Sequence, residues 1–379
     1  MPDNFDHAAN APAGLKIGVI VNNVGGYSRG VIRGIASFAF TSGWDCRVEG
    51  VNDHQLEKRL RTFDGLIVQA GTAETVRLIK RLRRPVVNVS SARSQRGVAS
   101  VVSDDAAVGR LGADHFLRLG FRRLAFFAPD DREFAALRAG GFTARAAEAG
   151  VPVTRTASAG DLADLVRRHA LDSHVPLAVM ACNDRAALAA LETCRATGAA
   201  VPEQVAVLGV DNDELAQSLA RPALSTINTA RERIGFEAAS LLQELIAGRR
   251  PEPLVRLVPP RGVIARRSTD AAAVGDADVA AAVRYVYANA GRPIGVDDVA
   301  RAGAVSRRQM ERRFRAALGR SVHDEITRCR LDRVKQLLLE TDLTLPQVAA
   351  AGGFRSANYL GTVFRRHVGQ TPASFRGLR

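Results

Sequence analysis

Residues 296–321 read VDDVARAGAVSRRQMERRFRAALGRS, and residues 345–372 read LPQVAAAGGFRSANYLGTVFRRHVGQTP. The two stretches are variants of one pattern. Their Val-Ala pairs, at 299–300 and 348–349, align at an offset of 49. The serine, apolar and glycine positions then align at an offset of 50: Ser306, Met310, Phe314 and Gly319 against Ser356, Leu360, Phe364 and Gly369. The chain therefore carries a duplicated unit, with one residue added in the second turn.

Each copy has the layout of a helix-turn-helix. A short helix carries the Val-Ala pair inward, a glycine (Gly303 or Gly352) allows the turn, and a serine can cap the free amides of the second helix. In that second helix Met310 and Phe314, four residues apart, share one buried face. The spacing therefore predicts two helix-turn-helix units, each with a polar face on its second helix.

The predicted outward faces are rich in guanidinium, amide and hydroxyl groups. Such side chains bind phosphate oxygens and the base edges of the DNA major groove. The candidate DNA-binding residues are Arg307, Arg308, Gln309, Arg312 and Arg313 in the first copy, and Arg355, Ser356, Asn358, Thr362 and Arg365 in the second. A solvated helical bundle is the alternative for one Arg-rich helix, but two copies at matched spacing favour DNA binding.

The stretch 321–340 between the copies predicts one long helix, with Ser321 as cap and Asp324 three residues later. Its apolar side chains should pack on both copies; they are Ile326, Val334, Leu337 and Leu338. A rigid connector of this kind would fix the distance between the two outward faces. We therefore expect both second helices to enter successive major grooves, about 34 Å apart, from one subunit.

The second copy resembles the DNA-binding signature of the AraC family of transcription regulators. The matching positions are Gly353, Phe354, Phe364, Gly369, Thr371, Pro372, Phe375 and Arg376. Leu360 departs from that pattern, in which an aromatic residue is usual, but it keeps the position apolar. The resemblance implies an all-α DNA-binding domain, which we place at residues 278–379.

Charge and composition agree with a nucleic-acid partner. The 379-residue chain has a net charge of +14, and residues 278–379 hold 18 Lys and Arg against 9 Asp and Glu. The four cysteines include no CxxC pair, so neither a disulfide framework nor a metal site is expected. Residues 1–13 lack the pattern of a signal peptide and are expected to form a flexible tail. These features predict a cytoplasmic protein that binds double-stranded DNA and not a membrane.

From Leu15 the chain alternates short apolar runs with longer helical patterns, which is typical of parallel α/β folding. The predicted strands are 16–22, 46–51, 65–70, 85–90, 99–104, 123–129, 177–183 and 205–211. The predicted helices include 106–119, 133–149, 184–197 and 230–247. A ligand of such a sheet binds beyond the carboxyl ends of the strands.

The middle of the chain resembles the sugar-sensing core of the LacI and GalR family, which is related to type I periplasmic binding proteins. The runs that carry this resemblance include VVSDDAAVGRLGADHFLRLGFRRLAFF (101–127), RAGGF (138–142), ACNDRAALAALE (181–192) and VLGVDND (207–213). The resemblance implies a sensor of two α/β lobes at residues 14–268, followed by a linker at 269–277. It also implies a homodimer.

Three candidate ligand-binding residues carry over from those motifs: Arg138, Asn183 and Asp211. A carboxylate accepts from neighbouring sugar hydroxyls, a guanidinium donates to them, and an amide does both. Other interpretations remain open, since Asn183 can cap the following helix and Asp211 can cap a loop. Tyr27, after the first strand, either stacks on a sugar face or packs in the core.

Two features suggest an enzyme, and neither has the required context. Residues 26–30 match G-x-S-x-G, but they follow the first strand, so no earlier strand can supply an oxyanion hole. The first turn also lacks the glycine and lysine pattern of a nucleotide site. No catalytic residues and no cofactor are therefore expected.

The order of the two domains, with the runs 209–225 and 257–270, resembles the xylose operon regulators. That resemblance implies a sugar effector, D-xylose first, and activation of sugar-catabolism genes, with RNA polymerase as a further candidate partner. The alternatives are a regulator of the same architecture that senses another ligand and, less favoured, a sugar-binding transport component or an enzyme.

Overall fold

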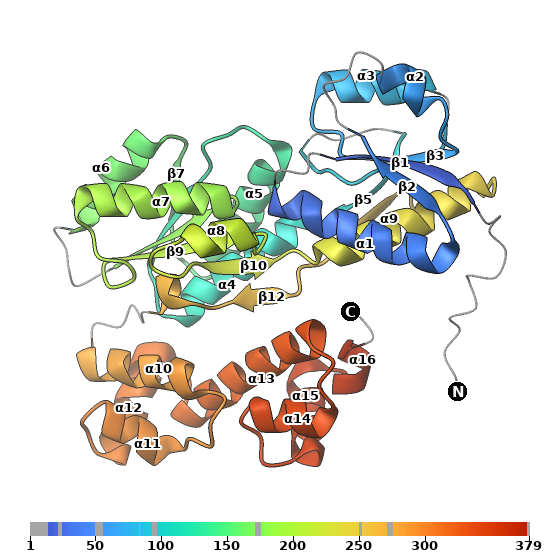
Figure 1. The fold of residues 1–379 in the computed structure, drawn as a ribbon. Helices are drawn as coiled ribbons and strands as arrows, with labels where there is room; N and C mark the ends of the chain where they lie inside the picture. The colour runs from blue at the N-terminus through green and yellow to red at the C-terminus, as the bar shows by residue number, and fades with distance from the viewer. Residues whose placement is uncertain are drawn as a thin grey trace.

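The computed structural model describes residues 14–21, 25–49, 56–82, 84–92, 97–170, 176–249, 252–270 and 276–376. The expected tail at 1–13 lies outside these ranges. Two α/β lobes are followed by a helical domain beneath the second lobe (Figure 1). In the described part of the chain no helix is long and apolar enough to span a bilayer.

The first lobe is built on a parallel six-stranded sheet in the order β11-β5-β4-β3-β1-β2. Its strands are β1 (Lys16–Ile20), β2 (Asp45–Val48), β3 (Gly65–Val68), β4 (Val86–Asn88), β5 (Ala99–Ser103) and β11 (Val255–Val258). Its helices are α1 (Gly26–Ser42), α2 (Leu56–Leu60), α3 (Ala73–Leu82) and α9 (Arg231–Ile246). Helix α1 packs along α9 on one face of the sheet, and α2 and α3 lie on the other (Figure 1).

The second lobe repeats the arrangement with the sheet order β12-β10-β9-β8-β6-β7, in which β12 alone is antiparallel to its neighbour. Its strands are β6 (Arg123–Phe127), β7 (Val153–Thr156), β8 (Leu177–Ala181), β9 (Val205–Val210), β10 (Ser225–Asn228) and β12 (Gly262–Ile264). Its helices are α4 (Asp105–Arg118), α5 (Glu133–Glu148), α6 (Ala159–Ala170), α7 (Asp184–Thr197) and α8 (Glu214–Leu219), with the 3-10 turn η1 (Arg267–Thr269).

The chain crosses between the lobes three times. The crossings run from β5 to α4, from β10 to α9 and from β11 to β12. Short crossings of this kind form a hinge, since a few residues can absorb a rotation of one lobe against the other. Side chains at the crossings therefore lie where a ligand between the lobes would be bound.

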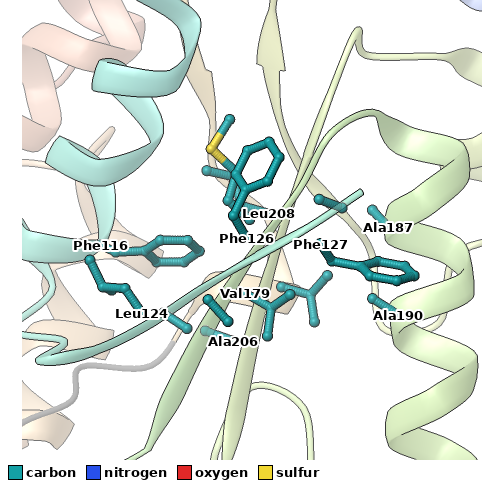
Figure 2. Packing of buried hydrophobic residues seen from close by; sticks show 14 of the residues in the cluster. Phe116, Leu124, Phe126, Phe127, Val179, Ala187, Ala190, Ala206 and Leu208 are labelled. Carbon is teal, nitrogen blue, oxygen red and sulfur yellow. The ribbon is translucent and has the colours of Figure 1, made fainter. Parts of the chain in front are cut away.

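The core of the second lobe shows why its strands read as continuous apolar runs. Consecutive side chains of β6 point to opposite faces of the sheet, Phe126 toward the side of α4 and Phe127 toward Ala187 and Ala190 of α7 (Figure 2). Both phenylalanines are about 1 % exposed. A parallel strand with helices on both faces has no solvent side, so its sequence loses the polar alternation.

The helical domain has the predicted duplicated form. The first copy consists of α11 (Val296–Ala302) and α12 (Arg307–Leu318), and the second of α14 (Leu345–Ala351) and α15 (Ala357–Val368). Helix α10 (Ala277–Asn289) precedes them, α13 (Val322–Glu340) connects them, and α16 (Pro372–Arg376) closes the domain. The Val-Ala pairs are buried, and Ser306 and Ser356 cap α12 and α15 as predicted.

The connector α13 packs on both copies, as its apolar pattern predicts. Its Ile326 lies in the core of the first copy with Met310 and Phe314. Val334 and Leu338 lie in the core of the second copy, and Leu337 packs against that core. At about 1.5 Å per residue, this 19-residue helix is roughly 28 Å long. One rigid element thus connects two separate cores.

The eight predicted strands and four named helices all form, with ends shifted by a few residues. Four strands were not predicted: β7, β10, β11 and β12. Each has only three or four residues, and most of the side chains of β7, β11 and β12 are at least partly exposed. Such strands have little apolar pattern, and their pairing is decided by the tertiary fold.

Candidate functional site

Arg138 lies at the centre of a charged cluster between the lobes. The residue is 3 % exposed. Its Nε donates to Asp105 Oδ1 at 2.7 Å, its Nη1 donates to the Cys182 carbonyl at 2.6 Å, and its Nη2 lies 3.7 Å from Asp211 Oδ1. Burial alone would lower the pKa of Arg138, but Asp105 and Asp211 outweigh it and raise the pKa above its ordinary value. The guanidinium therefore stays charged at the site.

Two glycines allow this cluster to form. A Cβ at Gly109 of α4 would lie 2.0 Å from the carbonyl oxygen of Arg138, and one at Gly141 of α5 would lie 2.1 Å from that of Ala106. Only glycine permits backbones to approach so closely. The R-x-x-G-F motif thus has two functions, since Gly141 brings α5 against α4 and Arg138 then reaches Asp105, the first residue of α4.

Asp211 lies at the same site, directly after β9. Its φ is +103°, and that of Asn212 is +51°, so two non-glycine residues adopt left-handed backbone conformations. Thr229, at a crossing between the lobes, donates to Asp211 Oδ1 at 3.3 Å. Burial raises the pKa of Asp211, with Arg138 and Arg231 acting in the opposite direction. Backbone strain at a partly buried carboxylate is typical of a functional site.

Tyr27 and Asn183 lie nearby, and the side chain of each forms a hydrogen bond with a backbone group. The Tyr27 hydroxyl donates to the Val89 carbonyl at 2.8 Å, and burial raises its pKa, with a further increase from Asp105 and Asp211. The Asn183 Oδ1 accepts from the Ala186 amide at 2.8 Å, so this side chain does cap α7. Capping uses its oxygen and leaves the Nδ2 group as a further donor.

The structure adds residues that the motif comparison did not select. Asp105 is 2 % exposed and binds both Arg138 and the Ser91 hydroxyl. The Phe134 ring lies 4.9 Å from the Arg138 guanidinium carbon. Asp105 directly follows a predicted strand, where ligand-binding residues of such a sheet are expected. Ser91 had the same signal, since it follows the predicted strand 85–90, whereas Phe134 lies at a helix start and had none.

Asp184, next to Asn183, has a structural role in the second lobe. Its carboxylate accepts from the Thr226 hydroxyl at 2.6 Å and from the Asp213 amide at 2.7 Å. Burial raises the pKa of Asp184 to about 7. These bonds hold the loop after β9 in place, and with it Asp211.

A cavity of about 460 Å³ opens at the carboxyl ends of β6 and β7. Two buried polar atoms on its wall have no hydrogen-bond partner within the described part of the chain: Asp130 Oδ1 and Thr156 Oγ1. Thr156 is 6 % exposed. Buried polar groups are usually satisfied, so these oxygens are available to the hydroxyl groups of a ligand.

The two lobes also contact each other through an inter-lobe bridge formed by Gly26, Arg29, Asp213 and Arg231. Asp213 accepts from the Gly26 amide at 2.9 Å and from Arg29 Nη2 at 2.6 Å. Arg231 Nη2 donates across the lobes to the Asn212 carbonyl at 3.3 Å, and its Nη1 donates to the Gly26 carbonyl within the first lobe at 2.6 Å. The segment 26–30 that matches G-x-S-x-G is thus part of a lobe contact. Its Ser28 donates to Gln69.

In the helical domain, α12 exposes most of the predicted face. Arg307, Arg308, Gln309 and Arg312 are exposed. Arg307 is paired with Asp297 of α11 at 3.3 Å, and Gln309 accepts from Ser306 within a capping box. Salt bridges at exposed positions are weak, so Arg307 can exchange Asp297 for a phosphate.

Arg313 differs from the prediction. Its guanidinium binds both Asp276, the cap of α10, and Asp278, with a 2.9 Å contact to the latter. The side chain is 33 % exposed. Arg313 therefore connects α12 to the start of α10. The spacing of Met310 and Phe314 predicted an outward position for Arg313, because the local sequence of α12 does not show where α10 lies.

The matching helix α15 exposes Asn358, Thr362 and Arg365, and Arg355 is exposed in the turn before it. Ser356 is also exposed, but its hydroxyl caps the Tyr359 amide. Tyr359, which was not among the predicted residues, is 38 % exposed and stacks under Arg355 with 4.5 Å between guanidinium carbon and ring centroid. An aromatic residue on an Arg-rich face can contact thymine methyl groups or sugars.

A buried carboxylate joins the helical domain to the second lobe. Glu325 of α13 is 0 % exposed and binds Arg320 and Arg328. Burial alone would raise the pKa of Glu325, but the two guanidiniums lower it below its usual range. Arg320 also donates to the Arg118 carbonyl at the end of α4, and Arg328 bonds the Tyr287 hydroxyl. The domains are therefore in direct contact, as their proximity in Figure 1 suggests.

The sensor lobes and the helical domain each match a known protein family. The periplasmic binding protein-like domain family matches residues 113–269, and the helix-turn-helix domain family matches residues 299–377. Together with the fold, these matches define the class: a transcription regulator with a periplasmic binding protein-like sensor and an AraC-type helix-turn-helix domain.

Relatives along almost the whole chain are xylose operon regulatory proteins. The Escherichia coli K12 protein is 29 % identical over 96 % of this chain and 97 % of its own length, and the Haemophilus influenzae protein is 27 % identical over 95 % and 98 %. The solved structure of a xylose-binding transcription activator matches with a TM-score of 0.61 at 26 % identity, covering 97 % of this chain and 99 % of that one. These relatives are transcription regulators, and this chain, with its helix-turn-helix domain, is a DNA-binding transcription regulator.

Proposed function

We propose that this chain activates sugar-catabolism genes when D-xylose binds between the lobes of its sensor. The observation that carries the proposal is the charged cluster of Asp105, Arg138 and Asp211. Two carboxylates and one guanidinium suit a ligand that offers several neighbouring hydroxyls and no charge. The xylose operon relatives support D-xylose as the first effector to test.

Within this proposal, Asp211 accepts from a pair of sugar hydroxyls, Arg138 donates to one, and Asn183 donates through Nδ2. Tyr27 closes the site from the first lobe, where its hydroxyl bonds Val89. Asp105, which the sequence comparison did not select, adds a second acceptor. We also propose that residues 14–268 form the sensor, residues 269–277 the linker and residues 278–379 the DNA-binding domain.

Helix α4 offers a physical route from the sugar to the DNA-binding domain. Its first residue, Asp105, lies in the charged cluster, and the carbonyl of its last residue, Arg118, accepts from Arg320 of the helical domain. A rotation of the lobes on sugar binding would turn this rigid helix and move both ends together. Coupling of this kind requires that sugar bind the DNA-competent arrangement more tightly.

On DNA, Arg308, Arg312, Arg355 and Arg365 are proposed to contact phosphates or guanine edges, with Arg307 joining them after leaving Asp297. Gln309, Ser356, Asn358 and Thr362 complete the two faces. We infer a cytoplasmic homodimer that can contact RNA polymerase when bound upstream of a promoter. The dimer would place two chains on paired sites, as symmetry in such regulators requires.

Calorimetric titration of the full chain with D-xylose, arabinose, ribose, glucose and galactose tests the effector. Saturable binding of D-xylose alone is the expected result. Tighter binding of another pentose or hexose would keep the mechanism and replace the effector. The absence of heat from all five sugars would contradict the sugar proposal and leave a regulator that senses a different ligand.

A further inference from the structure

The second helix-turn-helix copy carries an arginine stacked on an aromatic ring at the start of its second helix. Arg355 lies in the turn before α15, and its guanidinium carbon is 4.5 Å from the centroid of the Tyr359 ring. Both residues are exposed, Tyr359 by 38 %. A guanidinium held against a ring is attracted by its π-electrons and loses less conformational freedom on binding than a free one. This Arg355–Tyr359 stack is therefore preorganised at the surface.

Contacts within the second copy hold the Tyr359 ring in place. Its backbone amide donates to Ser356 Oγ at 3.2 Å, and its ring lies beside that of Phe354, with the ring centroids 6.2 Å apart. Phe354 is 7 % exposed and belongs to the core of this copy. The ring of Tyr359 is thus attached to the core, and Arg355 lies against that ring.

Different residues occupy the equivalent positions of the first copy. At the offset of 50, Val305 corresponds to Arg355, and Gln309 corresponds to Tyr359. Val305 packs against the core of the first copy, and Gln309 forms a capping box with Ser306. The first copy therefore reaches the same fold without an arginine on an aromatic ring at this place. Packing of the helix-turn-helix alone does not account for the stack.

The stack lies where a helix-turn-helix contacts base edges. Residues at the N-terminus of its second helix enter the major groove, and Tyr359 is the third residue of α15. A guanidinium that bonds the O6 and N7 atoms of guanine lies in the plane of that base. Successive base pairs are about 3.4 Å apart, so a ring stacked 4.5 Å from the guanidinium carbon lies level with the adjacent pair.

One apolar group is available at that level. In the major groove the C5-methyl group of thymine is the apolar feature that a base pair presents. We propose that the Arg355–Tyr359 stack recognises a guanine and an adjacent thymine of the operator. Arg355 bonds the O6 and N7 atoms of the guanine, and the ring of Tyr359 contacts the thymine methyl group. A phosphate contact by Arg355 would need neither the ring nor a particular base, so experiment can separate the two.

Duplexes selected from a random pool by the full chain supply the operator, and modified bases then test single atoms of it. Each thymine is replaced in turn by deoxyuridine, which lacks the methyl group, and each guanine by 7-deazaguanine, which lacks the N7 acceptor. Affinities are measured by filter binding at one salt concentration. We expect one deoxyuridine to weaken binding about fourfold, and 7-deazaguanine in the adjacent base pair to weaken it about fivefold or more.

Variants of the stack connect each modified base to one side chain. Tyr359→Ala should lose the sensitivity to deoxyuridine, and Arg355→Met should lose the sensitivity to 7-deazaguanine, because each removes the group that contacts the missing atom. Tyr359→Phe keeps the ring and should retain both sensitivities. Arg366→Met is the matched charge control, since it removes an exposed arginine from the last turn of α15 and should also retain both.

The proposal is overturned if the unmodified chain tolerates deoxyuridine next to every guanine whose N7 it requires. It is also overturned if Tyr359→Ala or Arg355→Met stays as sensitive as the unmodified chain to the corresponding modified base. The proposal rests on the proposed entry of α15 into the major groove, and selection of no duplex at all would contradict both. Ratios between modified and unmodified duplexes do not depend on the effector, so failure of the sugar proposal remains distinguishable.

Discussion

Removal of the Arg29–Asp213 ion pair should weaken effector binding without altering any residue of the charged cluster. Arg29 Nη2 lies 2.6 Å from Asp213 Oδ1, and the two side chains are 29 % and 20 % exposed. A partly buried, charged hydrogen bond of this kind contributes about 1–2 kcal/mol, between the values for exposed and for buried pairs. The pair connects the two lobes, so its contribution stabilises their arrangement in this structure.

We therefore expect Arg29→Met to reduce sugar affinity about 5- to 30-fold, since each 1.36 kcal/mol corresponds to a factor of ten. This range is an upper limit. If the lobes already adopt this arrangement in most molecules without sugar, losing the ion pair lowers sugar affinity by less than its full free energy. Methionine keeps much of the apolar stem of Arg29, and Asp213 keeps its bond to the Leu215 amide. The measurement is calorimetry with D-xylose, or with whichever sugar of the panel binds.

Arg33→Met is the matched control for this variant. Arg33 also joins the lobes, through Glu214 at 3.0 Å, but the two side chains are 50 % and 65 % exposed. An exposed pair contributes well under 1 kcal/mol, so affinity should change by about twofold or less. If Arg29→Met binds sugar as tightly as the unmodified chain, or if both variants lose affinity equally, the reasoning about the inter-lobe bridge is refuted.

Three further predictions concern stability and DNA binding. Glu325→Gln should destabilise the helical domain by about 3 kcal/mol in urea unfolding followed by circular dichroism, because it leaves two guanidiniums around a neutral amide. The pKa of Glu325 is lowered in the folded state, so its charged form contributes to the free energy of unfolding above the unfolded-state pKa of about 4.3. This contribution is lost as pH falls through the folded-state pKa, and Glu325→Gln should lack this pH dependence. Asp184 has a raised folded pKa of about 7, so its ionisation should make the unmodified chain less stable as pH rises from about 4 to 7. An equal pH dependence in Asp184→Asn would contradict this assignment. Arg308→Ala and Arg312→Ala should each reduce the log-log salt slope of DNA binding by about 0.9 if the residue contacts one phosphate, and an unchanged slope would exclude that contact.

Local patterns were sufficient for much of this fold. The helix-turn-helix units follow from apolar spacing of four residues and from capping serines, both of which act within one or two turns of chain. The long strands of the sensor follow from their continuous apolar runs. By contrast, β10 and β12 pair with each other across a connection that includes α9 and β11, and nothing in their few residues encodes that pairing.

The candidate site was only partly accessible from the sequence, for a similar reason. Arg138 and Asp211 follow from motifs, and the structure brings them within 3.7 Å of each other. Asp105 enters the cluster because Gly109 and Gly141 allow α4 and α5 to approach, which is a property of the packed pair. Arg313 is paired with two carboxylates at the start of α10 and so does not extend freely from the predicted DNA-binding face. Such ion pairs are decided by tertiary contacts.

The central claim is that sugar occupancy between the lobes changes DNA affinity. Duplexes selected from a random pool by the full chain in the presence of D-xylose provide the operator. Filter binding at one salt concentration then compares affinity with and without saturating sugar. We expect the two operator affinities to differ by about 5- to 150-fold, the usual range for coupled sites. We also expect the operator to tighten sugar binding by the same factor. Equal operator affinity under both conditions, with sugar binding demonstrated, would contradict the account.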